Sequence, residues 1–172
     1  MIYESVAASE PIAQGDIFTS LPRVDVSLQR MIVLNADESA QESTWKALAE
    51  DQRNKPEPIR AILPVVPIDA IVITQTCDAL RAESISLCEI VSIDKVLKNS
   101  SDWSIKTWEK NLTKQDTDSL RWFYLPPGGA SRFSERSAAD FRTIVRLRRE
   151  ELEVARHLRA GRLNGIAYEH FR

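Results

Sequence analysis

The clearest feature of the hydrophobic pattern is a continuous apolar run that ends in polar residues. Residues 70–79 read AIVITQTCDA, in which Ile71, Val72 and Ile73 are consecutive β-branched residues. Such residues favour extended backbone, and a run that is apolar on both faces is typical of a strand covered on both sides. We therefore predict that this run is a strand at the centre of a sheet.

Shorter apolar or alternating runs predict further strands around this one. They lie at residues 16–20, 23–34, 59–66, 84–93, 121–125 and 141–147. Pro22, Pro64 and Pro67 place bends, bulges or edges in the strands near them, because proline has no amide hydrogen to donate. The chain does not alternate strands and helices in the βαβ manner, so we expect antiparallel pairing.

Helical patterns lie outside these strands. Residues 35–58 form a polar insertion or lid with a helix at 42–52, and residues 95–118 form a helical insertion. Residues 148–172 form a C-terminal, arginine-rich helical tail that is broken at Gly161. The predicted fold over residues 1–172 is a single domain, mostly β with peripheral helices (α+β), built as a small, partly open antiparallel barrel.

The composition fits a soluble protein. The chain has 172 residues, of which 43% are hydrophobic and 28% charged, as in ordinary globular proteins. No run approaches the roughly 18 apolar residues of a membrane span. The first residues lack the basic and apolar parts of a secretory signal. We expect a cytoplasmic protein.

The net charge of -2 hides a basic region at residues 139–172, which holds eight arginines and five carboxylates. A basic patch suits phosphate contacts or an acidic protein partner. Glutamates are interleaved with the arginines, and this pattern favours a solvated, salt-bridged helix face. Both alternatives stay open.

The two cysteines and two histidines do not predict a metal site or a disulfide. A turn at residues 80–83 would place Cys88 opposite Gln75 rather than Cys77, which is too far for a disulfide. His157 and His170 lack the spacing of paired zinc ligands. We predict no metal and no cofactor, and an inert, buried thiol at Cys88.

Polar residues at the end of the central strand are the candidate site. We name residues 74–78 the TQTCD segment. At the exit of a central strand such residues either bond the local turn backbone or contact a ligand. Both interpretations stay open at the level of sequence.

The order of several motifs resembles the MazF/PemK-like proteins. The chain has Gly15-Asp16-Ile17, then Pro22, then the strand 71–74 that runs into polar residues, then a second strand at 86–93. The string VITQTCD, followed later by FYLP and an arginine-rich ending, is similar to a group of bacterial proteins of which some are suspected of roles in phage defence. The resemblance implies an SH3-like barrel and a homodimer.

Members of that family cut single-stranded RNA or act as toxins that an antitoxin peptide neutralises. In them an Arg-Pro pair precedes the strand that matches residues 71–74, and the arginine stabilises the scissile phosphate. Here the matching place reads Pro67-Ile68-Asp69-Ala70. A carboxylate at Asp69 would repel the negative charge of the transition state. The family's hydroxyl at the end of the following strand falls on Ser92.

Two functions follow. The first is a binding or regulatory module with its nuclease chemistry lost, which presents the TQTCD segment, and with it the tail, to a protein partner or to single-stranded RNA in a toxin–antitoxin or phage-defence setting. Its candidate binding residues are Thr74, Gln75, Thr76, Cys77, Asp78, Gly15 and Asp16.

The alternative is a metal-independent endoribonuclease with a rearranged site. Its candidate catalytic residues are Asp78 as the base, Arg81 as the phosphate partner, and Ser92. Arg60 is a second candidate for the phosphate. A Cys77 nucleophile would need one of the distant histidines as its base. A third interpretation treats the TQTCD segment as a plain turn and places an interface in the aromatic region 103–123.

Overall fold

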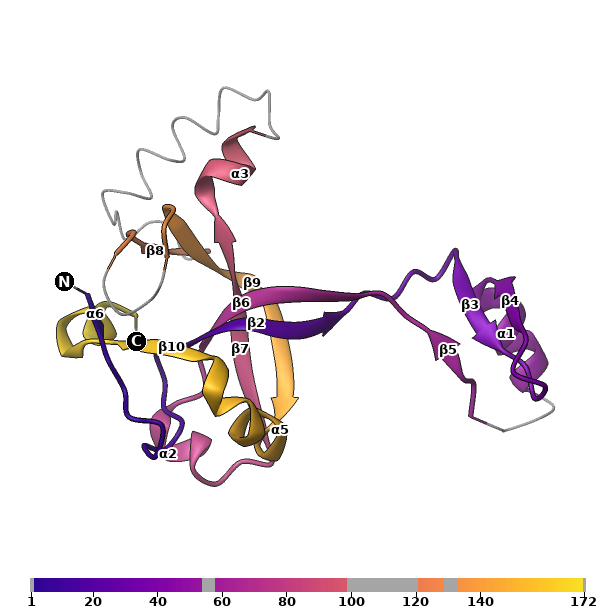
Figure 1. Ribbon diagram of the computed structural model, residues 1–172, viewed down its shortest axis with the longest axis horizontal. Helices are drawn as coiled ribbons and strands as arrows, with labels where there is room; N and C mark the ends of the chain where they lie inside the picture. Colours follow the sequence, from indigo (N-terminus) through magenta and orange to yellow (C-terminus); the bar gives the residue numbers. More distant parts are fainter. Residues whose placement is uncertain (1, 54–57, 99–120, 129–132, 172) are drawn as a thin grey trace. The chain divides into compact units, whose positions relative to one another are not determined.

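The computed structural model describes residues 2–53, 58–98, 121–128 and 133–171. It divides into two compact units (Figure 1). Unit 1 comprises Met1–Leu21 and Ile68–Arg172, and unit 2 comprises Pro22–Pro67. The predicted polar insertion at residues 35–58 falls within unit 2. That residues 1–172 form a single domain stays a prediction, since compact units of one chain are not by themselves independent domains.

The larger sheet of the described residues has seven strands in the order β1-β10-β2-β6-β7-β9-β8. Their bounds are Tyr3–Glu4 (β1), Asp16–Val24 (β2), Val65–Val72 (β6), Ser84–Ser92 (β7), Trp122–Leu125 (β8), Ser137–Arg148 (β9) and Arg159–Leu163 (β10). The recorded pairings are antiparallel. The predicted central strand, β6, holds the fourth of the seven positions. The prediction of a mostly β, open antiparallel sheet with peripheral helices is confirmed, whereas the SH3-like description rests on the resemblance and stays a prediction.

Strand β6 is buried on both faces, as its sequence predicts. Ala70, Ile71 and Val72 are fully buried. Ile71 lies opposite Cys88 of β7 on one face, and Val72 lies opposite Leu87 on the other. Burying a large aliphatic side chain stabilises a fold by roughly 1.5–3 kcal/mol, so this run anchors the sheet.

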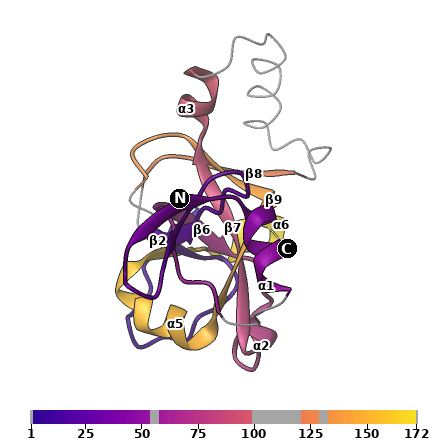
Figure 2. The same cartoon turned by 90° about the vertical axis from the view of Figure 1, so that its right-hand side faces the viewer.

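Helices cover the sheet and its ends. Their bounds in unit 1 are Thr76–Ala79 (α2), Ile93–Lys98 (α3), Arg149–Val154 (α5), the 3₁₀ turn Ala155–Leu158 (η2) and Gly165–Phe171 (α6). Phe171 of α6 packs edge-on against Phe123 of β8, with ring centroids 5.1 Å apart. Leu152 of α5 is fully buried, and α5 contacts β7 and β9. Figure 2 shows α2 and α3 at opposite ends of β7.

The predicted C-terminal helical tail is wrong in its middle part. Residues 159–163 form β10, which pairs with β1 on one side and β2 on the other. Gly161 does not break a helix there but lies within this strand, opposite Ile17. A five-residue strand with two arginines has no apolar alternation, so its pairing is decided by non-local partners.

A bulge divides β9. Cys88 pairs with Ile144, but the next residue of β7, Glu89, pairs with Asp140. Asp140 accepts hydrogen bonds from the amide of Arg142 at 3.0 Å and from both the Nε and Nη2 atoms of Arg121 at 3.1 and 2.9 Å. Burial raises the pKa of this carboxyl, but the hydrogen bonds of Arg121 and Arg142 outweigh burial and hold the pKa below its ordinary value.

Unit 2 is a three-stranded sheet with one helix. Its strands, in the order β4-β3-β5, are Met31–Leu34 (β3), Ala40–Ser43 (β4) and Ala61–Ile62 (β5). Helix α1, Trp45–Gln52, begins after Thr44, whose hydroxyl accepts from the Ala47 amide. This helix was predicted at 42–52. The predicted strand at 23–34 is corrected: β2 passes through Pro22 to Val24, and β3 starts only at Met31.

The remaining predictions divide between confirmed and undescribed segments. The strands predicted at 84–93, 121–125 and 141–147 correspond to β7, β8 and β9, and the last is longer than predicted. Of the helical insertion 95–118, the structure describes only the part within α3, and the rest lies outside the described residues. In the described part of the chain no helix is long and apolar enough to span a membrane.

Candidate functional site

The TQTCD segment lies where β6 ends. The backbone amides of Ile73 and Thr74 both donate to the carbonyl oxygen of Ser86, at 3.0 and 3.3 Å, and this doubled contact ends the regular ladder. The Thr74 hydroxyl accepts from the Ser86 amide at 2.8 Å. Thr74 therefore bonds the backbone of β7. For this one residue the structure favours backbone bonding over ligand contact.

Residues 75–78 are exposed, and residues 76–79 form the single turn α2. The amides of Asp78 and Ala79 donate to the carbonyl of Gln75, while Ala79 is buried and anchors the turn. The Cys77 sulfur lies 4.0 Å from Oε1 of Gln75. Among the described residues none donates a hydrogen bond to the Asp78 carboxylate. The side chains of Gln75, Cys77 and Asp78 thus face solvent from a fixed backbone.

The predicted turn at residues 14–16 lies against this segment. The Gln14 amide donates to the Thr76 hydroxyl at 3.3 Å, and the Gly15 amide donates to the Val72 carbonyl at 2.9 Å. Gly15 has φ +86°, a conformation that other residues adopt only with strain, and its carbonyl accepts from the Leu163 amide at 3.0 Å. Two distant predicted motifs therefore meet at the end of β6.

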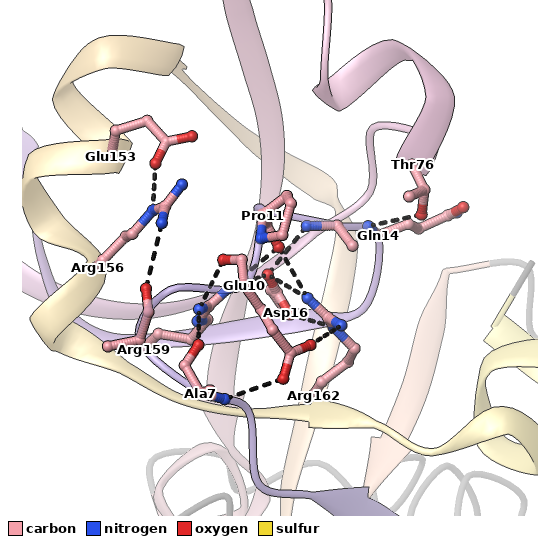
Figure 3. A network of polar contacts seen from close by, with 12 residues as sticks. Ala7, Glu10, Pro11, Gln14, Asp16, Thr76, Glu153, Arg156, Arg159 and Arg162 are labelled. Atoms are coloured by element: carbon pink, nitrogen blue, oxygen red, sulfur yellow. Dashed lines mark hydrogen bonds and ion pairs between the residues drawn. The ribbon is translucent and has the colours of Figure 1, made fainter.

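Asp16 is not available to a ligand. Its side chain is fully buried and pairs with Arg159 Nη1 at 3.0 Å and with Arg162 Nε at 2.5 Å, while the Ala13 amide donates to it at 3.0 Å. Figure 3 shows both arginines converging on this carboxylate. The predicted binding role of Asp16 is replaced by a structural one, because its acceptor positions are already occupied.

The same arginines hold the N-terminal segment in place. Arg159 donates to the carbonyl oxygens of Ala7, Glu10 and Pro11, at 2.7, 3.0 and 3.3 Å. Arg162 pairs with Glu10 as well as Asp16. Burial alone would lower the pKa of Arg162, but the hydrogen bond and charge of Asp16 raise that pKa above its ordinary value. We call Asp16, Arg159 and Arg162 the buried ion cluster.

Basic groups lie near α2, as the nuclease interpretation requires. Arg149 Nη1 donates to the Leu80 carbonyl at 3.0 Å, and Arg146 Nη2 lies 3.4 Å from the Ser84 hydroxyl. Arg81 is exposed, and its amide donates to the Asp78 carbonyl. In the described structure neither Arg81 nor any other cation forms an ion pair with Asp78.

Ser92 lies at the far end of β7 from Asp78. The eight-residue separation between Ser84 and Ser92 spans about 26 Å of strand. The Ser92 hydroxyl donates to Glu135 Oε2 at 2.6 Å and accepts from the Lys95 amide at 3.3 Å, so it caps α3. The structure therefore does not bring Ser92 together with Asp78.

Asp69 and Arg60 also have local partners. Oδ1 of Asp69 accepts from the amide of Ser20 at 3.1 Å, and Ser20 has φ +59°. The carboxylate thus bonds the backbone at a strained position within β2. Arg60 belongs to unit 2, where its Nη2 donates to the Asn35 carbonyl at 3.0 Å.

The thiols and imidazoles do not form a described catalytic pair. Cys77 is exposed, Cys88 is buried, and both are free. Cys88 lies opposite Ile71, so the predicted position opposite Gln75 is wrong. The reason is that β6 ends at Val72 and the connection to β7 contains α2 instead of a tight turn. Burial raises the pKa of the Cys88 thiol to about 12. His157 Nδ1 lies 3.1 Å from the Val154 carbonyl.

The described part of the chain contains no recognisable metal-binding site. Among the residues that the structure describes, no group of three or more His, Cys, Asp or Glu side chains is arranged to hold a metal ion. Of the aromatic region 103–123, only residues 121–123 are described. Arg121 lies 4.4 Å from the centroid of the Trp122 ring, and its guanidinium pairs with Asp140.

Sequence reasoning missed two features. The first is the buried ion cluster, which the arginines of the tail do not reveal because their partner is 143 residues away. The second is a cavity of about 490 Å³ in unit 2, lined by residues of β3, β4 and α1 together with residues 58–60. Neither has a local sequence signal, since both depend on how distant segments pack.

Comparison with known proteins gave no match: no family model, no curated protein and no solved structure is similar to this chain. The resemblance to the MazF/PemK-like proteins therefore stays a prediction.

Proposed function

We propose that this protein is a binding module that presents residues 75–78 to a protein partner. The observation that carries the proposal is the combination of a fixed backbone with free side chains at the end of β6. Gln75, Cys77 and Asp78 are exposed on a turn whose neighbours bond Ser86, Gln14 and Arg149. A backbone that hydrogen bonds already fix loses little conformational entropy on binding, which favours recognition through the side chains it presents.

The loss of nuclease chemistry is part of this proposal. Asp69, which stands where the family has a phosphate-binding arginine, bonds the Ser20 amide instead. Ser92 caps α3 and is remote from Asp78. A toxin–antitoxin or phage-defence setting is our inference from the resemblance alone.

The exposed thiol gives a direct test. Cys77 is exposed, so we expect it to take up a thiol-directed photocrosslinker in the folded protein, while burial and a pKa of about 12 protect Cys88. We expect irradiation in an extract of the native host to give a crosslinked partner at Cys77. Unlabelled wild-type protein should compete for that partner, and unlabelled Asp78→Ala protein should compete at least about tenfold less well.

A matched control is Glu83→Ala, which removes an exposed carboxylate a few residues beyond α2. This variant should compete like the wild type. Equal competition by Asp78→Ala and wild type, with both proteins folded, would show that residues 75–78 are a plain turn.

The second candidate is a metal-independent endoribonuclease. The observation that favours it is a set of arginines around the connection from α2 to β7: the Arg81 amide bonds the Asp78 carbonyl, Arg149 bonds Leu80, and Arg146 bonds Ser84. The test is cleavage of a long mixed-sequence RNA with and without chelator. Cleavage by the wild type that is lost in Asp78→Ala and kept in Glu83→Ala would establish this function in place of the first.

A further inference from the structure

The second half of β9 is an open strand edge. Strand β8 pairs only with residues 137–140 of β9, and the described residues include no strand beside residues 142–148 on the side away from β7. An open edge presents unpaired amides and carbonyls that can pair with an added strand. This edge consists of different residues from the TQTCD segment.

The direction of the backbone groups on this edge follows from one hydrogen bond. The Arg149 amide donates to the Glu83 carbonyl at 2.8 Å, so residue 149 points its polar groups at β7. Direction alternates along an antiparallel strand, and the register of β9 on β7 is regular from Ile144 to Arg148. The amides and carbonyls of Ile144, Arg146 and Arg148 therefore point outward.

The side chains along this edge alternate between cationic and apolar. Arg142, Arg146 and Arg148 are exposed, and Ile144 between them is 53% exposed. On the other face Val145 and Leu147 are only half-buried, although they lie opposite the fully buried Leu87 and Ile85. An added strand would cover this apolar surface.

The charge of the edge is only partly compensated. Arg148 pairs with Glu150 and Glu151. In contrast, no described carboxylate pairs with the side chains of Arg142 or Arg146. Among the described residues the Arg146 side chain has one hydrogen bond, to the Ser84 hydroxyl. Edge arginines also discourage pairing between identical copies: a second β9 added antiparallel would place arginines near arginines, which is destabilising.

We propose that this edge of β9 binds an extended, acidic segment of a partner protein as an additional antiparallel strand. The residues of that segment opposite Arg146 and Arg148 are carboxylates, and those between them are apolar and cover Val145 and Leu147. The inference is independent of the proposed role of residues 75–78, and the variants below distinguish the two.

The probe is a fluorescein-labelled peptide, Val-Glu-Val-Glu-Val-Glu-Val-amide, measured by fluorescence anisotropy. It should bind, and the same peptide with lysine in place of glutamate should not. Its glutamate amides are the ones that face β9. Methylation of the glutamate nitrogens should therefore abolish binding, whereas methylation of the valine nitrogens, which face away, should leave most of it.

The protein variants locate the contact. Arg146→Glu should weaken binding by roughly tenfold or more, since a hydrogen bond to a charged group contributes about that factor. Ile144→Pro removes an outward amide without touching the bonds to β7 and should also weaken binding, while Ile144→Thr should not. Arg81→Glu, a matched charge reversal just beyond α2, should bind like the wild type.

Three results would overturn the proposal. They are equal binding of the lysine peptide, equal binding of the two methylated peptides, and binding unaffected by Arg146→Glu in a variant that melts like the wild type. Binding of a single-stranded RNA oligonucleotide in place of the acidic peptide, with the same dependence on Arg146, would assign the edge to nucleic acid instead.

Discussion

At the scale of single residues, the carboxylate of Asp16 has the largest consequence. It is fully buried, and the side chain of Arg159 is only 2% exposed. A buried charge without its partner is strongly destabilising, because its desolvation is no longer offset. Asp16 therefore contributes to stability in a way that its position in a Gly-Asp turn does not suggest.

We predict that Asp16→Ala lowers the free energy of unfolding by about 3 to 5 kcal/mol, as measured by chemical denaturation. The control is Asp25→Ala, which breaks the exposed pair with Arg23 and should cost about 1 kcal/mol or less. Equal, small losses in the two variants would mean that the buried ion cluster adds nothing to stability.

Asp140 predicts a pH dependence. Burial raises its pKa, but the hydrogen bonds of Arg121 and Arg142 outweigh this and depress the folded-state pKa. A depressed carboxyl pKa stabilises the fold above the unfolded value of about 3.9 and loses that contribution as the pH falls through the folded value.

The expected result is that Asp140→Asn is less stable than the wild type at pH 6, and that this difference shrinks at pH 3. Denaturant midpoints at the two pH values measure it. A constant difference between wild type and Asp140→Asn would contradict the depressed pKa.

At the scale of elements, the sequence predicts the centre of the sheet well and its closing strand poorly. The run through Ile71 and Val72 is apolar on both faces, and this local signal is enough to identify β6. β10 has no such signal: Arg159 and Arg162 are members of the buried ion cluster, and Gly161 suggests a break. Its strand conformation depends on β1 and β2, which are far away in the sequence.

The candidate site likewise has a part that the sequence predicts and a part that it does not. The exposure of residues 75–78 follows from their polarity at a strand end, and the sequence indicates it. The structural roles of Asp16, Asp69 and Ser92 cannot be predicted from the sequence. Each bonds a group that is distant in the sequence and that only the fold brings close. A polar side chain in a motif can as easily satisfy buried backbone as contact a ligand.

A truncation tests whether the end of the chain is a solvated tail or contains a strand that the fold requires. Removing residues 159–172 deletes β10, leaves Asp16 without its two arginines, and uncovers Ile17. We predict that this variant does not fold, as measured by loss of the cooperative thermal transition. The control is removal of residues 165–172, which deletes only α6 and should leave a destabilised but cooperative fold. A cooperative transition in the variant that lacks residues 159–172 would show that β10 is dispensable.

At the scale of the whole molecule, the two units differ in how much they bury. In the described part of unit 2 only Met31 is buried, while Val24, Val26, Leu28, Ile32, Trp45, Ile62 and Val65 are exposed. Unit 1 contains nearly all of the buried core. Stability that depends on buried apolar area is therefore concentrated in unit 1.

We predict that residues 26–63 can be replaced by Asn-Gly without unfolding unit 1. The Asp25 amide donates to the Pro64 carbonyl at 3.1 Å, so the two chain ends are close enough for a two-residue hairpin turn. The melting temperature should change by only a few degrees. In the intact protein, amide hydrogens of unit 2 should exchange much faster than those of β6 and β7, and a large loss of stability on replacement would contradict this independence.

The position of β10 also governs when the protein can fold during its synthesis. β1 and β2 are made before β10, but neither pairs with the other, since β10 lies between them. While the ribosome translates the intervening segments, this edge of β2 has no partner strand and the Asp16 carboxylate has no arginine partner, because both partners lie in residues 159–163. A chain stalled before that point leaves this edge of β2 unpaired, so β2 presents an open strand edge until residues 159–163 have been made.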